Sequence, residues 1–110
     1  MAVPALLTCL TNTDSNLRFR ATAALATCQG EPSVLVPAFT ERLNDSDAPT
    51  RSQALVGLSR FGPLASNSAP AVIRLLNDPE VYLVRPCARE CLQAIAGSKG
   101  AARGQPSNYK

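Results

Sequence analysis

The amino-acid sequence predicts an all-α protein in which six helices form three antiparallel hairpins, stacked side by side as a solenoid. The first observation is an internal repeat of 33 residues that runs through most of the chain. The second is a spacing of three and four residues between small and apolar side chains in each unit, which is typical of one face of an α-helix. The third is the set of glycine and proline residues at the ends of the units, where helices stop.

The repeat is carried by prolines, leucines and acidic or amide residues. Arg18 and Arg51 also lie 33 residues apart, whereas Arg85 follows after 34, so the third unit holds one extra residue. The residues that recur at intervals of 33 are Pro4, Pro37 and Pro70; Leu10, Leu43 and Leu76; Asn12, Asp45 and Asp78; and Asp14, Asp47 and Glu80.

The second half of each unit has the pattern of a buried helix face. Small residues recur at one position, where they let neighbouring helices approach closely, and leucines four residues later fill the space beside them. We place the three units at about residues 3–30, 31–63 and 64–97. The small residues are Ala21, Ala54 and Ala88, and the leucines are Leu25, Leu58 and Leu92.

Capping residues predict where the second helices begin and end. Asp14 and Asp47 are suited to capping the N-terminus, and Pro49 suits the first turn, where an N–H has no intrahelical acceptor. Pro86 would interrupt a helix interior, so we expect the second helix of the third unit to begin late or distorted, near residues 82–83. The glycines expected to end the second helices in the left-handed conformation are Gly30, Gly62 and Gly97.

In each unit a proline in the first helix is followed by an acidic or amide residue at the end of that helix, then by an arginine, and then by the spaced alanine and leucine. This pattern, in three copies over residues 3–96, resembles the HEAT repeat. It is most similar to the short bacterial form also seen in phycobilisome lyase-type repeat proteins, because a unit of 33 residues is shorter than the ~40–47 of most HEAT repeats. The resemblance implies a right-handed α–α superhelix.

The resemblance also implies a role for the repeated acidic and arginine residues. In HEAT families they form a ladder of contacts between adjacent repeats, so we expect them to fix the stacking of the units. Asn12 departs from the acidic pattern, as a first repeat with no preceding neighbour can. A direct role in ligand binding is the alternative interpretation. The expected ladder residues are Asn12, Asp45 and Asp78, with Arg18, Arg51 and Arg85.

In HEAT proteins the second helices line the concave side of the solenoid, and the resemblance therefore places partner contacts there. The polar residues outside the predicted core of these helices are mixed in charge and modest in number. They fit either a partner-binding surface or a merely solvated face. The candidate partner-binding residues are Arg20, Ser52, Gln53, Ser59, Arg60, Arg89, Glu90 and Gln93.

The net charge of +3 comes entirely from the last residues of the chain. Residues 1–97 carry eight acidic and eight basic side chains, and the excess lies on Lys99, Arg103 and Lys110. A neutral folded part lacks the positive field that drives nucleic-acid binding, so we do not expect a nucleic-acid partner. A nucleic-acid-binding HEAT-like protein is the alternative, because some HEAT-like proteins are DNA alkylpurine glycosylases. Residues 98–110 are small and polar, and we expect a disordered basic tail.

No catalytic or metal-binding motif is recognisable in the sequence. The chain has no histidine, and it therefore lacks the usual general base and metal ligand. Its four cysteines match no zinc or redox motif, and we interpret Cys87 and Cys91, which share a helix face, as buried apolar side chains. We expect no enzyme activity, no cofactor and no metal. The alternative, by resemblance of the repeat, is a subunit of a phycobilin lyase-type enzyme.

A helical solenoid without catalytic residues is typical of an interaction module, and we expect a scaffold that binds another protein on its concave surface. About three repeats are needed for stability, and the sequence offers no extra capping helix before Val3. This favours a fragment of a longer array, or self-association through an end repeat, over a small self-sufficient solenoid. With no signal peptide and no stretch long enough to span a bilayer, we expect a cytoplasmic protein without membrane contact.

Overall fold

The structure, a computed structural model, describes residues 3–97. The predicted all-α class is confirmed, because this part of the chain contains helices and turns but no strand. None of its helices is long and apolar enough to cross a membrane. The predicted tail, residues 98–110, lies outside the described residues. The α-helices are α1 (Val3–Cys9), α2 (Ser15–Leu25), α3 (Pro32–Arg42), α4 (Ala48–Phe61), α5 (Ala69–Arg74) and α6 (Arg85–Ile95), and the 3₁₀-helices are η1 (Gly62–Ser68) and η2 (Leu75–Asn77).

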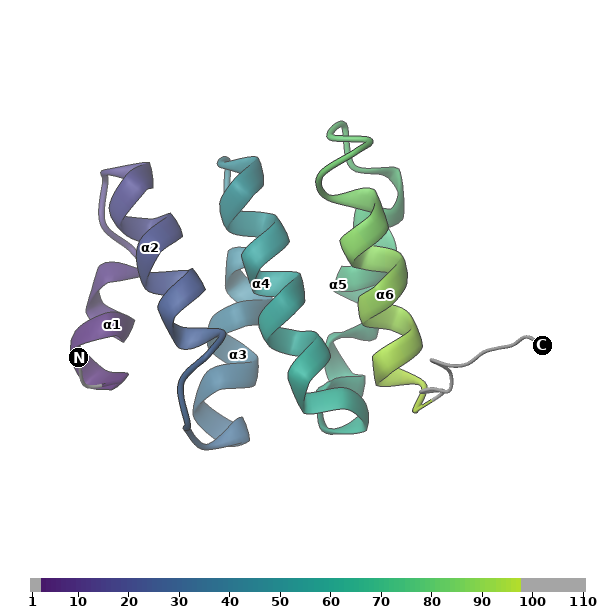
Figure 1. Ribbon diagram of the computed structural model, residues 1–110, viewed down its shortest axis with the longest axis horizontal. Helices are drawn as coiled ribbons and strands as arrows, with labels where there is room; N and C mark the ends of the chain where they lie inside the picture. Colours follow the sequence, from purple (N-terminus) through teal and green to yellow (C-terminus); the bar gives the residue numbers. More distant parts are fainter. Residues whose placement is uncertain (1–2, 98–110) are drawn as a thin grey trace.

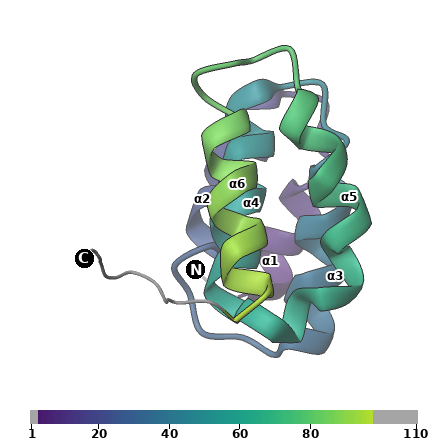
Figure 2. The same ribbon diagram turned by 90° about the vertical axis from the view of Figure 1, so that its right-hand side faces the viewer.

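The helices pack in pairs that follow one another along the long axis of the molecule (Figure 1). Helix α1 packs on α2, α3 on α4, and α5 on α6, while α4 also contacts both α2 and α6. Seen along the long axis, α2, α4 and α6 lie in one layer, and α3 and α5 lie in a second (Figure 2). The molecule measures 45 × 30 × 21 Å, so it is longest in the direction in which the pairs succeed one another.

The core lies between the two layers and between successive pairs. Leu25 and Leu58 are fully buried, and Ala21 and Ala54, which precede them by four residues, are buried as well. Burial of a leucine side chain stabilises a fold by about 1.5–3 kcal/mol. The equivalent leucine of the third pair, Leu92, is only half-buried, because its outer side has no further helix pair against it within the described residues.

The predicted starts of two helices are confirmed by side-chain caps. Asp14 precedes α2, and its Oδ1 accepts a hydrogen bond from the Asn16 amide at 2.9 Å. Asp47 precedes α4, and its Oδ2 accepts one from the Thr50 amide at 3.2 Å. Pro49 lies in the first turn of α4 as expected. Each cap satisfies an N–H that has no intrahelical acceptor and stabilises its helix by about 1 kcal/mol.

Glycine ends the second helices in two different ways. Gly62 and Gly97 have φ angles of 55° and 77°, in the left-handed region that was predicted for them. The same prediction for Gly30 is wrong, since its φ is not positive. A Cβ atom on Gly30 would come within 2.7 Å of Cδ1 of Leu35, so glycine serves there for the close approach of a core side chain of α3.

The third pair departs most from the regular pattern. Its first helix, α5, has only six residues and continues on both sides as the 3₁₀-helices η1 and η2. Its second helix begins at Arg85, later than the predicted 82–83, so that Pro86 falls in the first turn and interrupts no hydrogen bond. Turn residues 81–84 precede α6 and leave Tyr82 93% exposed.

Helices α3 and α4 approach closely at a glycine. A Cβ atom on Gly57 of α4 would lie 2.5 Å from Cζ of Phe39, which belongs to α3 and is fully buried. The Phe39 ring also packs against Phe61, with ring centroids 6.5 Å apart. The ring therefore cannot move away from residue 57 without disturbing the rest of the core.

We expect Gly57→Ala to destabilise the protein by about 1–3 kcal/mol, because the added methyl overpacks the core against Phe39. Helix propensity alone predicts the opposite sign, a gain of about 1 kcal/mol. Urea denaturation followed by circular dichroism measures the difference. The matched control is Ala24→Gly at the equivalent position of α2, for which we expect a loss of about 1 kcal/mol. A more stable Gly57→Ala protein would show that the contact is not tight.

Candidate functional site

An arginine of the first helix pair binds an aspartate of the second. Nε of Arg18 donates to Oδ2 of Asp45 at 2.9 Å, and Nη2 donates to Oδ1 at 3.0 Å. The remaining nitrogen, Nη1, donates to the carbonyl of Asn12 at 2.9 Å, within the first pair. The Asp45 side chain is only 2% exposed, so the bidentate contact is shielded from water.

The same arrangement recurs between the second and third pairs. Nε of Arg51 donates to Oδ2 of Asp78 at 2.8 Å, and Nη2 donates to Oδ1 at 3.0 Å. Nη1 of Arg51 donates to the Asp45 carbonyl at 2.7 Å, as Nη1 of Arg18 does to Asn12. The structure thus brings together two of the predicted ladder pairs, with the same atoms in the same roles.

The two outermost ladder positions make local contacts instead. Oδ1 of Asn12 accepts a hydrogen bond from the Asp14 amide at 2.8 Å and shapes the turn before α2. Nε of Arg85 donates to the Asp78 carbonyl at 2.6 Å. Among residues 3–97, neither side chain forms an ion pair with a neighbouring helix pair.

Sequence analysis missed Arg42, a second arginine that contacts Asp45. Nη1 of Arg42, at the end of α3, donates to Oδ2 of Asp45 at 3.0 Å and to the Leu10 carbonyl at 2.9 Å, where α1 ends. Asp45 therefore receives two guanidinium groups. The repeat could not reveal this, because the positions equivalent to Arg42 hold Cys9 and Leu75, and the only available signal was the spacing of three between Arg42 and Asp45.

Burial and the arginine contacts act on the two aspartates in opposite directions. Burial raises the pKa of Asp45, but hydrogen bonds from Arg18 and the Asp47 amide outweigh it, and the net pKa lies below the ordinary 3.8. The charges of Arg18 and Arg42 lower this pKa further. The pKa of Asp78 is lowered for similar reasons, against the effect of its burial. Both carboxylates are therefore ionised throughout the neutral range.

Two of the expected partner-binding residues do not lie on an open surface. Ser52 is 5% exposed, and its hydroxyl donates to the Pro49 carbonyl at 2.9 Å, so its assignment to a binding face is wrong. Ser59 is half-buried, and its hydroxyl donates to the Leu55 carbonyl at 2.8 Å. The reason is the central place of α4, which is covered on both sides by α2 and α6.

Arg60, another of these residues, links two helix pairs. Its Nη1 donates to the carbonyl of Ala26 and, at 3.3 Å, to that of Cys28, and it so caps the C-terminal end of α2. Gln53 is half-buried on α4. The remaining candidates, all exposed, are Arg20, Arg89, Glu90 and Gln93.

Val56 is an exposed apolar residue on the outer side of the layer formed by α2, α4 and α6, the layer that also carries the exposed polar candidates. Val56 is 41% exposed, although α4 is covered by α2, α6 and α3 on its other sides. It therefore points away from the core, on the outer side of this layer. The equivalent positions hold Ala23 on α2 and Glu90 on α6. Sequence analysis assigned Val56 to no site, since a valine in a helix is usually read as core.

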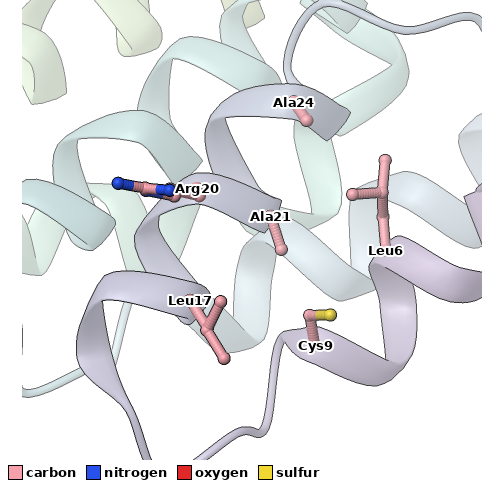
Figure 3. Close-up of a pocket in the computed structure, with 6 residues that line it drawn as sticks. All are labelled: Leu6, Cys9, Leu17, Arg20, Ala21 and Ala24. Atoms are coloured by element: carbon pink, nitrogen blue, oxygen red, sulfur yellow. The ribbon is translucent and has the colours of Figure 1, made fainter. Parts of the chain in front are cut away.

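A hollow of about 370 Å³ opens at the end of the molecule formed by the first helix pair (Figure 3). Its lining is almost entirely apolar, with one charged side chain, which extends away from the two residues of α1. The lining residues are Leu6 and Cys9 of α1, and Leu17, Arg20, Ala21 and Ala24 of α2.

The cysteines of α6 are shielded thiols. Burial raises the pKa of Cys91 to about 11, against the lowering effect of a hydrogen bond with Ser59. Burial and the charge of Glu90 also raise the pKa of Cys87. Both groups are therefore protonated at neutral pH and weakly nucleophilic. Within residues 3–97, no three cysteine, aspartate or glutamate side chains gather in a way that could hold a metal ion.

Comparison of the chain with protein-family models and with curated protein sequences finds no match. The class that the geometry defines is an all-α protein whose helix pairs are joined by buried arginine–aspartate contacts. The surfaces that this arrangement leaves open, around Val56 and at the hollow beside Leu17, are the candidate sites.

We expect Asp45→Asn to lower the free energy of unfolding at pH 7 by about 2–3 kcal/mol, because it leaves Arg18 and Arg42 without their carboxylate. The pKa of Asp45 is depressed in the folded protein, so its contribution is complete above the unfolded-state value near 3.8 and is lost as the pH falls through the lower folded value. Urea denaturation between pH 7 and pH 3 measures both effects.

The control is Asp14→Asn, which removes the same charge from an exposed cap where asparagine serves equally well. We expect it to change stability little at pH 7. The acid-induced loss of stability should be smaller in Asp45→Asn than in the wild type. The role given to Asp45 would be contradicted if the two variants lost equal stability at pH 7. It would also be contradicted if Asp45→Asn lost as much stability on acidification as the wild type.

Proposed function

We propose that the chain is a HEAT-like repeat protein, a right-handed solenoid of three helical hairpins, and that it acts as a scaffold by binding another protein. The support for the repeat is the contact made twice with the same atoms, Arg18 to Asp45 and Arg51 to Asp78. Equivalent contacts at equivalent positions are expected when equivalent hairpins stack with one geometry.

The surface proposed for the partner is the outer side of α2, α4 and α6, which run side by side in one layer (Figure 2). Val56 lies at its middle helix and offers an exposed apolar group. The neighbouring helices of this layer carry exposed residues of both signs, Arg20 on α2 and Glu90 on α6. An exposed apolar group together with polar residues of both signs is compatible with a protein–protein interface and unlike the positive surface that binds nucleic acid.

The polar contacts between helix pairs support a structural role for these side chains. Asp45 and Asp78 are saturated by arginines, and Arg60 is held by backbone carbonyls of α2. Their hydrogen bonds join one helix pair to the next, and they hold the outer layer in a fixed register. The proposed scaffold therefore offers a preformed surface, which lowers the entropic cost of binding.

The test uses two exposed valines in different layers. Val56 is 41% exposed on α4, and Val34 is 43% exposed on α3. We expect Val56→Arg to weaken partner binding at least tenfold, since an arginine at the centre of an interface cannot be desolvated without cost. Val34→Arg makes the same chemical change outside the proposed surface and should leave binding unchanged.

The measurement begins with affinity capture by the wild-type chain, and continues with titration of the purified partner against the three proteins. Circular dichroism establishes that both variants are folded. The proposed surface is contradicted if the partner binds Val56→Arg with the same affinity as it binds the wild type. It is also contradicted if Val34→Arg weakens binding to the same extent as Val56→Arg.

A further inference from the structure

Arg85 stands at the sequence position whose side chain joins one helix pair to the next. At this position Arg18 donates from Nε and Nη2 to Asp45 of the second pair. Arg51 donates from the same two atoms to Asp78 of the third pair. Arg85 follows Arg51 after 34 residues and is half-buried at the start of α6. Its Nε donates to the Asp78 carbonyl, and in the part of the chain that the structure describes its guanidinium forms no ion pair.

Arg89 lies one helical turn after Arg85, on the same face of α6. On α4 the equivalent face holds Arg51 and the fully buried Leu55, and it meets the third helix pair, since Arg51 reaches Asp78 there. Because the pairs follow one another in a row, this face of α6 points away from α4, and Arg89 is exposed (Figure 1). Two guanidinium groups therefore share one end of the molecule, and among the described residues neither has an ion-pair partner.

Apolar side chains of the kind that the inner interfaces bury lie at the same end. Leu92 is half-buried, whereas the equivalent leucines of the first two pairs are fully buried. Ile73 of α5 is 51% exposed, at the position of Thr40, whose hydroxyl bonds to Ser68 of the third pair at 2.6 Å. The C-terminal end face is defined here by Ile73, Arg85, Arg89 and Leu92.

The side chains of this face select the kind of partner that can cover it. An apolar surface alone would bury Ile73 and Leu92 but leave two guanidinium groups without an acceptor, which carries a high desolvation cost. A second copy stacked head to tail offers Arg85 only the Asn12 amide, and the same face of a second copy opposes arginine to arginine. A partner with both apolar groups and carboxylates matches the whole face.

We propose that the C-terminal end face binds an acidic helical protein, in which the turn between two helices presents an aspartate or glutamate to Arg85 and a second carboxylate meets Arg89. The model for the first contact is Asp78, which lies in the turn before α6 and is held by two nitrogens of Arg51. Arg85 reaches that arrangement when Nη1 takes over the Asp78 carbonyl and frees Nε for the carboxylate. This binding rests on the equivalent helix pairs of the proposed function, but it uses a face other than the one around Val56.

Lysine is absent from residues 1–97, so a single lysine in the end face is a unique chemical handle there. In Arg89→Lys the exposed guanidinium becomes an amine of the same charge, which a carbodiimide couples to a carboxylate in direct contact. The full-length variant is treated with the carbodiimide in an extract of the source organism, and mass spectrometry locates both ends of each cross-link. We expect position 89 to be coupled to an aspartate or glutamate of another protein. The matched control is Arg74→Lys, at an exposed arginine of α5 whose Nη2 bonds to Asn44 of the second pair, outside the end face.

Titration of the protein identified in this way then measures the contribution of each arginine. Arg89→Glu reverses an exposed charge and should weaken binding at least tenfold. Arg85→Gln should weaken it to a similar extent, whereas Arg74→Glu should leave it unchanged. Circular dichroism establishes that each variant is folded. Binding of the wild type should also weaken as the salt concentration rises from about 50 to about 500 mM, because salt screens charged contacts at the edge of an interface.

The proposal is overturned if position 89 is coupled to no other protein, if positions 74 and 89 are coupled to the same carboxylates, or if the partner binds Arg89→Glu as tightly as the wild type. Val56→Arg separates this face from the surface on the outer layer. A partner that is weakened by Arg89→Glu but not by Val56→Arg supports the end face and contradicts the surface around Val56. The reverse result contradicts the end face alone.

Discussion

Arg18 and Arg51 each extend out of their own helix pair and place a charged group on an aspartate that is almost fully shielded from water. A guanidinium or a carboxylate left alone in such a place costs several kcal/mol, so neither partner can shift without the other. The contact thereby fixes how neighbouring helix pairs sit against one another. Hydrophobic contact between leucines and alanines is less directional and would tolerate sliding. The charged contact fixes the register, and the apolar contact supplies most of the stability.

This register determines which side chains become surface. Helix α4 has neighbours on both sides, and it therefore buries Ser52 while exposing Val56. At the ends of the row, the same positions lose one neighbour. At α6, exposed Arg89 and Gln93 stand where other pairs bury a side chain, while Leu17 on α2 and Ile73 on α5 are apolar and exposed. The proposed partner surface is thus a consequence of how the helix pairs pack.

The all-α class and two helix caps could be predicted from the sequence, because each leaves a signal at a fixed interval or beside a helix end. The contacting arginine–aspartate pairs were expected from the resemblance to the HEAT repeat. Arg42 could not, since it occurs in one unit only and its role depends on where α1 ends. Ser52 was misassigned because burial depends on how many neighbours a helix has, and residue type does not report this. Gly30 was misread because a glycine before a helix can serve close packing as well as left-handed backbone.

At the positions equivalent to Gly57 and Phe39, which are in close contact, the first pair has Ala24 and Leu6, and the third pair has Cys91 and Val72. The side chain is largest where its opposite residue is smallest. The three helix pairs are therefore not interchangeable: transplanting one helix of a pair into another would leave either a void or a clash. Any exchange of helices between the pairs would have to move both members of each combination together.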